Sequence, residues 1–419
     1  MKIDKVIGRE IFDSRGNPAL ECEIVLENNM RVCGSVPSGI SRGTQEAFEL
    51  RDEDKRLNGL GLNKAIEIIE NILAPTLIGK EPELIDMDCM MLEIDGTDNK
   101  SNLGANTMLA ISIAVLKAQA LANDMEPYEL IAQLFDTDSV SLPFPMYNII
   151  EGGAHADNNL SLQELMIIPV GFKSFRASME AVSNVYQQMR VLLKKAKIQP
   201  IIGIEGGFAC DFEDEYQAID MVIEAIANAK LAADESFVFG LDVAASQLYN
   251  PKSKKYSWGN KNLSAKNLIE MYKSLTEQYP IYSIEDGLDE ADFEGWKLMM
   301  DELGNNIHVV GDDLFVTNPY KIAQGVADGL ANATIIKPNQ VGTITETLQS
   351  IKLCKQNDIN MIISHRSCET NDTTIVDLAV GTSSGHIKAG GLNHGERLAK
   401  YNRLLRIEDR LMLELLYAD

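Results

Sequence analysis

Five apolar runs in the second half of the chain each end in a charged residue. They are too short for helices of ordinary length, which favours buried strands. The runs occupy residues 238–242, 281–285, 309–312, 335–337 and 362–366, and they end in Asp242, Glu285, Asp312, Lys337 and the pair His365 and Arg366. The pattern predicts strands whose last residues carry charge to one edge of a sheet.

The spacing of these charges predicts how the strands are connected. Successive charged ends lie 43, 27, 25 and 28 residues apart, which leaves room for a strand, a helix and two loops each time. That rhythm is typical of a β/α barrel, whose active site collects at the C-terminal ends of the strands. Carboxylates, a lysine and a His-Arg pair around one pocket indicate metal-assisted chemistry on an anion.

The first third of the chain has a different pattern. Apolar alternation predicts antiparallel strands at 6–12, 20–26 and 30–36. Helical periodicity follows at 65–73, 84–92 and 105–122, with Ser101 or Asn102 as the expected N-cap of the last helix. Because strands and helices are grouped rather than alternated, we expect an α+β domain over residues 1–135.

Strands and helices alternate in the remainder, residues 136–419, which we interpret as a catalytic barrel domain. The segment 136–145 is the predicted linker. Beyond it we expect strands at 146–150, 162–170 and 200–204, helices at 174–195 and 214–230, the five runs above, and a final helix at 397–416. The predicted fold class is an α/β barrel preceded by an α+β domain.

Composition narrows the function without identifying it. With 419 residues, the chain suits a barrel of roughly 250 residues plus a second domain. A formal net charge of −24 argues against nucleic acid or an anionic membrane as the main partner, because both require basic patches. An anionic ligand would need local cations, such as divalent metal ions assisted by Lys337, Arg366 and Lys388.

Cysteine usage and hydropathy bear on location. The six cysteines lie far apart without a C-x-x-C pair, which favours reduced thiols over a disulfide or zinc framework. The N-terminus lacks a signal-type apolar stretch, and the apolar runs are shorter than the ~18 residues of a membrane helix. We therefore expect a cytoplasmic protein without a membrane span.

An ordered set of motifs runs through the whole chain. They lie at residues 12–18 (FDSRGNP), 36–43, 99–106, 152–159, 163–164, 205–207, 241–246, 283–286, 311–314, 337, 339–340, 364–367 and 398–402. Together they resemble the enolase family, the phosphopyruvate hydratases of glycolysis. The resemblance implies an enolase-type modified TIM barrel and magnesium-dependent, reversible dehydration of 2-phosphoglycerate to phosphoenolpyruvate. It also implies a homodimer with Glu21 and Arg406 at the interface, and leaves further assembly of dimers open.

The resemblance assigns a role to each charged strand end. Asp242, Glu285 and Asp312 resemble the ligands of the higher-affinity magnesium ion, and oxygen ligands suit that hard cation. Each carboxylate alone could be a solvated strand end, but three in register favour the metal. The polar segment 38–44 reads either as a surface connection or as a mobile lid. On it, Ser41 resembles the ligand of a second magnesium ion that arrives with substrate.

The resemblance also assigns the proton transfers and the contacts to the small phosphorylated three-carbon acid. Lys337 resembles the base, with a pKa that nearby cations should lower. Glu205 resembles the general acid, with Glu164 in the same acidic cluster. The expected substrate contacts are His155, Glu164, Glu285, Asp312, Lys337, His365, Arg366, Ser367 and Lys388.

Several positions depart from the family pattern near this site. Ile204 stands where an Asp normally precedes the catalytic Glu205, so a hydrogen-bonding partner is missing there. Pro338 should keep Lys337 extended. The other departures are Arg42, Ala154, Gln247 and Cys368. They leave two alternatives to a working enolase: a divergent paralogue acting as a binding or scaffold protein, and an enzyme that removes the same kind of proton from another acid.

Overall fold

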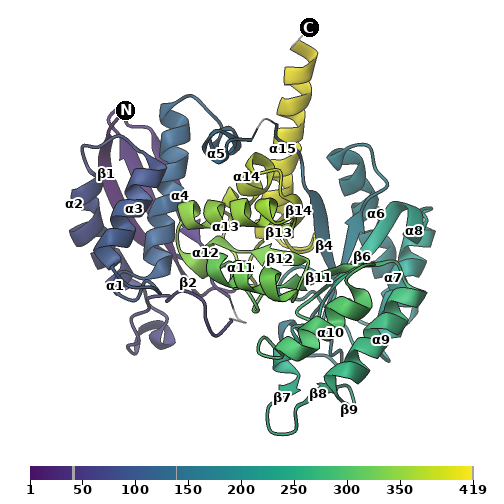
Figure 1. Cartoon of the computed structure of the whole chain (residues 1–419). Coiled ribbons are helices and arrows are strands. Elements are labelled where there is room, and N and C mark those ends of the chain that lie inside the picture. The colour runs from purple at the N-terminus through teal and green to yellow at the C-terminus, as the bar shows by residue number, and fades with distance from the viewer. Residues whose placement is uncertain (40–42, 138, 418–419) are drawn as a thin grey trace.

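The computed structural model describes residues 1–39, 43–137 and 139–417, with side chains described as far as residue 413. A smaller part from the N-terminal third lies beside a larger barrel, and the last helix rises away from the barrel at the C-terminus (Figure 1). Both predicted parts of the fold class are confirmed.

The N-terminal part is a three-stranded antiparallel sheet in the order β1-β2-β3, covered by helices. Its strands are β1 (Ile3–Phe12), β2 (Pro18–Leu26) and β3 (Arg31–Val36). Its helical segments are η1 (Arg56–Gly59), α1 (Asn63–Ile68), the π-helical η2 (Ile69–Leu73), α2 (Ala74–Leu77), α3 (Leu84–Asp95), α4 (Ala105–Ala122) and α5 (Pro127–Phe135). The strands and helices predicted in this region are therefore present.

Helix α4 is the central helix of this part and packs on β2 and β3. Among the described residues it alone is long and apolar enough to cross a membrane, and 83% of that window is buried inside the structure. Its predicted cap is wrong, because the N-cap is Gly104 at φ 86° without a side-chain hydrogen bond. Ser101 and Asn102 lie in the preceding turn, where Asp95 Oδ2 accepts from the Asn102 and Leu103 amides at 3.1 and 2.7 Å.

The larger part is a closed barrel in the strand order β4-β5-β6-β10-β11-β12-β13-β14. The strands are β4 (Phe144–Glu151), β5 (Glu164–Pro169), β6 (Phe237–Asp242), β10 (Ile281–Glu285), β11 (His308–Gly311), β12 (Ala333–Ile336), β13 (Asn360–Ser364) and β14 (Gly385–Lys388). Strand β5 is antiparallel to both neighbours, whereas the other pairs are parallel. The first residue of β5 therefore lies on the same edge as the last residues of the parallel strands.

Helices surround the barrel and hold its strands in order (Figure 1). They are α6 (Phe175–Lys195), α7 (Glu215–Asn228), α8 (Ala233–Ser236), α9 (Ala265–Gln278), α10 (Phe293–Leu303), α11 (Pro319–Asp328), α12 (Pro338–Val341), α13 (Ile344–Gln356), α14 (Thr374–Gly381) and α15 (Gly395–Tyr417). Polar N-caps explain several starts, because the Ser174 and Asp214 side chains accept from backbone amides three residues on.

A small apolar cluster fills the barrel interior away from the charged edge. It consists of Met146, Met166, Ile168, Val310, Ala333, Ile335 and Ile362. A Cβ on Gly240 would lie 2.8 Å from Met146 Cε, so glycine at this position makes room for the methionine. The interior is thus packed, and polar groups concentrate at one end.

Three features of the barrel region differ from the predictions. The apolar run 200–204 is not a strand, because Gly203 and Gly206 turn the chain back and Ile202 forms only an isolated bridge with Phe208. Strand β14 was not predicted, since its four residues include a histidine and a lysine. A small sheet of β7 (Tyr249–Asn250), β8 (Lys255–Trp258) and β9 (Lys261–Leu263) also interrupts the β/α rhythm before α9.

Candidate active site

The charged strand ends meet at one edge of the barrel. Asp242, Glu285 and Lys388 are the last residues of β6, β10 and β14, while Asp312 and Lys337 directly follow β11 and β12. A small cavity opens there. It is lined by His155, Gln163, Glu164, Glu205, Asp242, Asp312, Lys337, Ser364, His365, Arg366, Ser367 and Lys388. The structure therefore brings together most of the predicted site residues.

On one side of the cavity, carboxylates alternate with lysines; we call this the cation side. Lys388 Nζ lies 2.8 Å from Asp242 Oδ2, 3.0 Å from Glu285 Oε2 and 3.1 Å from Glu164 Oε2. The Lys337 ammonium donates to Asp312, whose other oxygen accepts from Gln340 Nε2 at 3.0 Å. Each of these four carboxylates has a lysine partner.

The protonation of Lys337 in this arrangement differs from the expected one. Burial favours the neutral amine, but the Asp312 carboxylate outweighs it and the pKa of Lys337 is raised. For Asp312, burial opposes ionisation while Lys337 favours it, and the pKa of Asp312 is lowered. The lowered lysine pKa thus remains a prediction that requires additional positive charge beside the amine.

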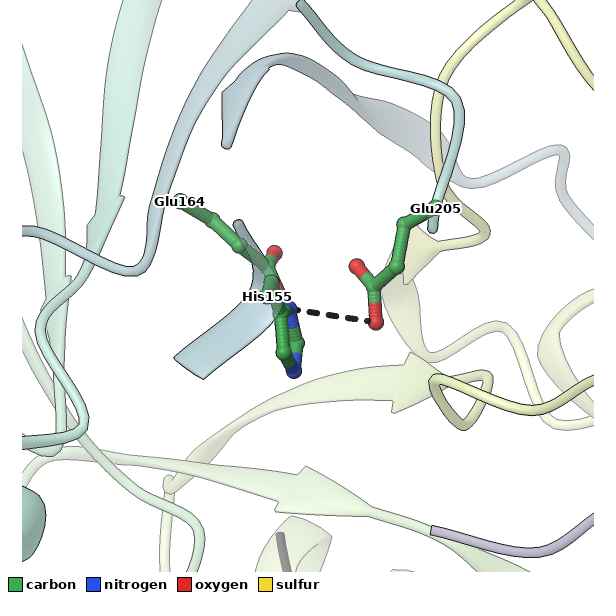
Figure 2. Close-up of side chains that lie close together, drawn as sticks. All are labelled: His155, Glu164 and Glu205. Atoms are coloured by element: carbon green, nitrogen blue, oxygen red, sulfur yellow. Dashed lines mark ion pairs between the residues drawn. The ribbon is translucent and has the colours of Figure 1, made fainter. Parts of the chain in front are cut away.

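Beside it lies a group with few cations, which we call the acid side: His155, Glu164, Glu205 and His365. Glu164 joins the two sides, because its other oxygen contacts Lys388. His155 Nδ1 is 3.4 Å from Glu164 Oε1 and 3.6 Å from Glu205 Oε1, so the imidazole lies between two carboxylates (Figure 2). His365 Nε2 is 3.4 Å from Glu205 Oε2. These side chains come from the loop after β4, the start of β5, the 203–207 turn and the end of β13.

Shared protons stabilise this crowded group. Burial lowers the pKa of His155, but Glu205 and Glu164 together raise it to about 9. Burial and the Glu205 charge raise the pKa of Glu164 to about 7. Burial alone would raise the pKa of Glu205, yet His365 and His155 lower it well below its ordinary value. Glu164 is thus the carboxyl of this pair that holds a proton near neutral pH, and Glu205 is ionised.

Arg397 of α15, which the sequence interpretation overlooked, fixes the orientation of His365. Its fully buried guanidinium donates to His365 Nδ1 at 2.6 Å and to the Arg366 and Ser367 carbonyls at 2.7 Å each. Arginine only donates, so Nδ1 must accept and the ring hydrogen lies on Nε2, toward Glu205. Burial first, with the Arg397 charge adding to it, lowers the pKa of His365 to about 3.

The predicted phosphate-binding arginine contacts a carboxylate of its own chain. Arg366 Nη1 donates to Glu46 Oε2 at 2.9 Å and to Asn339 Oδ1 at 3.0 Å, and Nη2 donates to Glu46 Oε1 at 3.1 Å. This parallel pairing is the geometry that arginine also uses with phosphate. Glu46 and Asn339 were not predicted, because their proximity depends on packing between the two parts of the fold.

Two residues of β4, Asn148 and Glu151, contact the backbone or carboxylate of Glu205 and were also missed. Asn148 Nδ2 donates to Glu205 Oε2 at 3.1 Å, and the Glu205 amide lies 3.1 Å from each Glu151 oxygen. Glu151 had the same sequence signal as the five charged strand ends, since Ile149 and Ile150 precede it. The predicted strand ended one residue too early.

The unusual substitutions fall in different surroundings. Gln247 Nε2 donates to Gln163 Oε1 at 3.1 Å, and Gln163 Nε2 in turn lies 3.4 Å from Asp242 Oδ2. Lys337 is extended at φ −126° with Pro338 opening α12, as predicted. Ala154 is exposed. Cys368 is buried, and its backbone forms an isolated antiparallel β-bridge with Ser38. Ser41 and Arg42 lie outside the described residues.

The acidic edge has the donor chemistry of a magnesium site. Within the described residues, the sets whose ligand atoms all lie within 4.8 Å of one another are His155, Glu164 and Glu205, and Asp286, Asp312 and Asp313. Of the predicted trio, only Asp312 belongs to these sets. Burial and the Asp242 charge raise the pKa of Glu285 well above its ordinary value, as expected where carboxylates need a cation. The buried oxygen donors therefore fit a hard divalent ion.

Of the two predicted interface residues, Glu21 is on β2 of the N-terminal sheet and Arg406 is on α15. Glu21 Oε1 accepts from Arg9 Nη1 at 2.9 Å, and its other oxygen accepts from Ser35 Oγ at 2.9 Å. Arg406 is exposed and lines a surface hollow with Val32 and Lys117. The single chain leaves their pairing across an interface as a prediction.

Fold and site define a class: a β/α barrel capped by an α+β domain, with an acid-and-lysine site at the C-terminal ends of its strands. Family models described as "Enolase, N-terminal domain" and "Enolase, C-terminal TIM barrel domain" match residues 3–131 and 139–419. The enolase of Ehrlichia chaffeensis is 46% identical over 417 residues, covering 99% of this chain and 98% of that protein. The enolase of Legionella pneumophila is 45% identical over 411 residues, covering 98% and 97%. The chain belongs to the enolase family.

Proposed function

We propose that Lys337 and Glu205 perform the two proton transfers of this enzyme, a phosphopyruvate hydratase of glycolysis. It is a hydro-lyase that reversibly dehydrates 2-phosphoglycerate to phosphoenolpyruvate, consistent with its family and relatives. One observation carries the residue assignment: Lys337 and Glu205 line the same cavity, one from the cation side and one from the acid side. A substrate lying between them meets a base at one carbon and an acid at the next.

Lys337 removes the proton from the carbon beside the substrate carboxylate. It acts as the neutral amine, which requires added positive charge beside it to lower the pKa that Asp312 raises. This proton is weakly acidic, so the negative charge that develops on the carboxylate must be stabilised by fixed positive charge. Lys388 is buried between Asp242, Glu285 and Glu164 and provides one such charge. Magnesium, which the family requires, would be held by Asp242, Glu285 and Asp312 and would supply further positive charge at that carboxylate. A second ion bound through Ser41 on arrival of substrate belongs to the same proposal.

Glu205 donates a proton to the departing hydroxyl, which leaves as water. Because the pKa of Glu205 is lowered by its two histidines, Glu205 must first gain a proton from a neighbour. Glu164, whose pKa is about 7, shares His155 with Glu205 and is the group placed to supply it. The paired carboxyls thus keep one proton available at neutral pH.

Arg366 binds the substrate phosphate, with Ser367 and His155 beside it in the cavity. For this to happen the phosphate must replace Glu46, which Arg366 contacts through both terminal nitrogens. His365, Glu164, Glu285, Asp312 and Lys388 complete the proposed contacts to the substrate and its carboxylate.

Turnover of 2-phosphoglycerate by the folded protein tests the proposal. We expect ultraviolet absorbance from phosphoenolpyruvate to rise in the presence of magnesium and to stop on addition of a chelator. No magnesium-dependent rise would exclude a working enolase and favour the scaffold alternative. No comparison favours that alternative, and retention of Arg366, Ser367 and Lys388 favours a phosphorylated substrate over another acid.

The assembly, location and domain boundary form a separate part of the proposal. We propose a cytoplasmic homodimer, with the chain divided between residues 135 and 136. The exposed Arg406 of one copy would meet Glu21 of a second copy. Sedimentation of the wild type should give a dimer that Arg406→Glu weakens and that Arg406→Glu combined with Glu21→Arg restores. A monomeric wild type would contradict the proposal.

A further inference from the structure

Position 204 lies in the turn that carries Glu205, and its side chain cannot accept the hydrogen bonds of that turn. An Asp side chain commonly accepts hydrogen bonds from backbone amides two or three residues ahead, which fixes a tight turn. The resemblance to the enolase family leads us to expect Asp before Glu205, whereas this chain has Ile204. The 203–207 turn therefore needs another acceptor for its amides if Glu205 is to be held in place.

Glu151 at the end of β4 is that acceptor. Its side chain is fully buried under the turn. Oε1 accepts from the Gly207 amide at 2.6 Å and lies 3.1 Å from the Glu205 amide, and Oε2 lies 3.1 Å from the same amide. The Gly207 amide lies three residues ahead of position 204, so an Asp there could also reach it.

The surrounding glycines make room for this carboxyl group. A Cβ on Gly203 would lie 2.2 Å from Glu151 Oε2, and one on Gly207 would lie 3.2 Å from Glu151 Cγ. The turn can approach the carboxyl group at Gly203 because that position lacks a side chain. The Ile204 carbonyl is meanwhile bound by Arg397 Nη2 at 3.3 Å, so the turn is held from two directions.

We propose that Glu151 is a positioning residue that replaces the acidic side chain missing at position 204 and holds Glu205 toward its histidines. The inference rests on the proposed role of Glu205 as general acid. Strand β4 contacts Glu205 twice, since Glu151 binds its amide and Asn148 donates to its carboxylate at 3.1 Å. Burial and the Glu205 charge raise the pKa of Glu151 to about 8, and a neutral carboxyl still accepts amide hydrogens through its carbonyl oxygen.

A set of variants separates positioning from general stability. Glu151→Leu removes both acceptors and should lower kcat by roughly 10- to 100-fold while KM stays within about twofold, because the acid is misplaced but the substrate contacts remain. Glu151→Gln retains one acceptor oxygen and should lose less. Glu215→Gln is the matched control, because Glu215 is also buried and accepts from a backbone amide, that of Ser161 at 2.8 Å, outside the cavity. It should leave kcat unchanged.

Rescue by Ile204→Asp provides the decisive comparison. Alone, this substitution should not raise kcat, because Glu151 already fills the role. In the Glu151→Leu background, Ile204→Asp should raise kcat about tenfold. In the Glu151→Gln background, where less activity is lost, it should raise kcat by a smaller factor. Equal effects of Ile204→Asp in the presence and absence of Glu151, or unchanged kcat in Glu151→Leu, would overturn the proposal.

Hydrogen exchange gives a readout that does not depend on activity. The amides of Glu205 and Gly207 should exchange faster in both Glu151 variants than in the wild type and in Glu215→Gln. Unchanged exchange would contradict the proposal even if kcat fell. A wild type without turnover would instead overturn the proposed function, while exchange would still decide whether Glu151 holds the turn.

Discussion

The cation side and the acid side of the cavity handle buried charge in opposite ways. On the cation side, Lys388 pairs with Asp242 and Glu285, and Lys337 pairs with Asp312. On the acid side, Glu164 and Glu205 share His155, and the pKa of His155 is about 9 while that of Glu164 is about 7. The cation side thus consists of lysine–carboxylate ion pairs, of which Lys337–Asp312 must separate before Lys337 can act as a base. The acid side has protons that can be redistributed near neutral pH.

The difference matches the chemistry proposed for each side. Removal of a carbon-bound proton needs permanent positive charge beside the substrate carboxylate. Departure of a hydroxyl needs a carboxyl that gains and loses a proton. The acid side also contains the Ile204 departure, and there Glu151 and Arg397 hold the turn.

The largest expected effect comes from the base. Lys337→Ala should lower kcat by roughly 10²- to 10⁴-fold or abolish turnover, because it removes the proposed base. Binding of 2-phosphoglycerate, measured by calorimetry, should survive, since Lys388 and Arg366 remain. Lys297→Ala, which removes an exposed lysine on α10, should not change kcat. Retained turnover in Lys337→Ala would contradict the assignment of the base to the cation side.

The next effect concerns the stability of the acid side. The pKa of His155 is raised from its ordinary value of 6.5 to about 9. A raised pKa means that the folded state binds the proton more tightly, so this stabilisation is fully present below pH 6.5 and is lost as pH rises through about 9. The cost of His155→Gln in the free energy of unfolding should therefore be about 2–3 kcal/mol larger at pH 7 than at pH 10.

Urea denaturation at the two pH values measures this difference. His308→Gln is the control, because burial lowers the pKa of His308 and that ring is already neutral over this range. A cost of His155→Gln that does not depend on pH would show that His155 is not protonated between the two carboxylates.

The smallest expected effect concerns Glu46. The Glu46 carboxylate forms an ion pair with the Arg366 guanidinium, so an incoming phosphate must displace Glu46. Glu46→Gln removes the competing charge and should tighten inorganic phosphate binding about three- to tenfold in calorimetry, equivalent to about 1 kcal/mol. Glu10→Gln, which breaks a carboxylate–arginine pair with Arg56 away from the cavity, should leave it unchanged. Weaker phosphate binding in Glu46→Gln would mean that Glu46 positions Arg366 rather than competing for it.

The pattern of charged strand ends predicts most of the cation side but, on the acid side, only His365. Asp242, Glu285, Asp312 and Lys337 each follow an apolar run, and parallel strands bring such ends to one edge. Glu164 opens an antiparallel strand, so its charge precedes the apolar run and the same rule does not identify it. Its role came from the family motifs instead.

Failures elsewhere have physical causes. The run 200–204 is as apolar as a strand, but Gly203 and Gly206 let it turn beneath Glu205. The contacts of Arg397 and Glu46 join segments more than 30 residues apart, and no local pattern indicates them. Gln247 lies too far along the chain from Gln163 for their hydrogen bond to be foreseen.

Exchange of the substrate's C2 hydrogen with solvent tests the division of labour between the two sides most directly. In Glu205→Gln, incubated with 2-phosphoglycerate and magnesium in deuterated water, Lys337 should still exchange that hydrogen while phosphoenolpyruvate formation falls by roughly 10²- to 10⁴-fold. Lys337→Ala should lose both exchange and product. Loss of exchange in Glu205→Gln with substrate still bound would contradict the assignment of separate base and acid to the cation and acid sides.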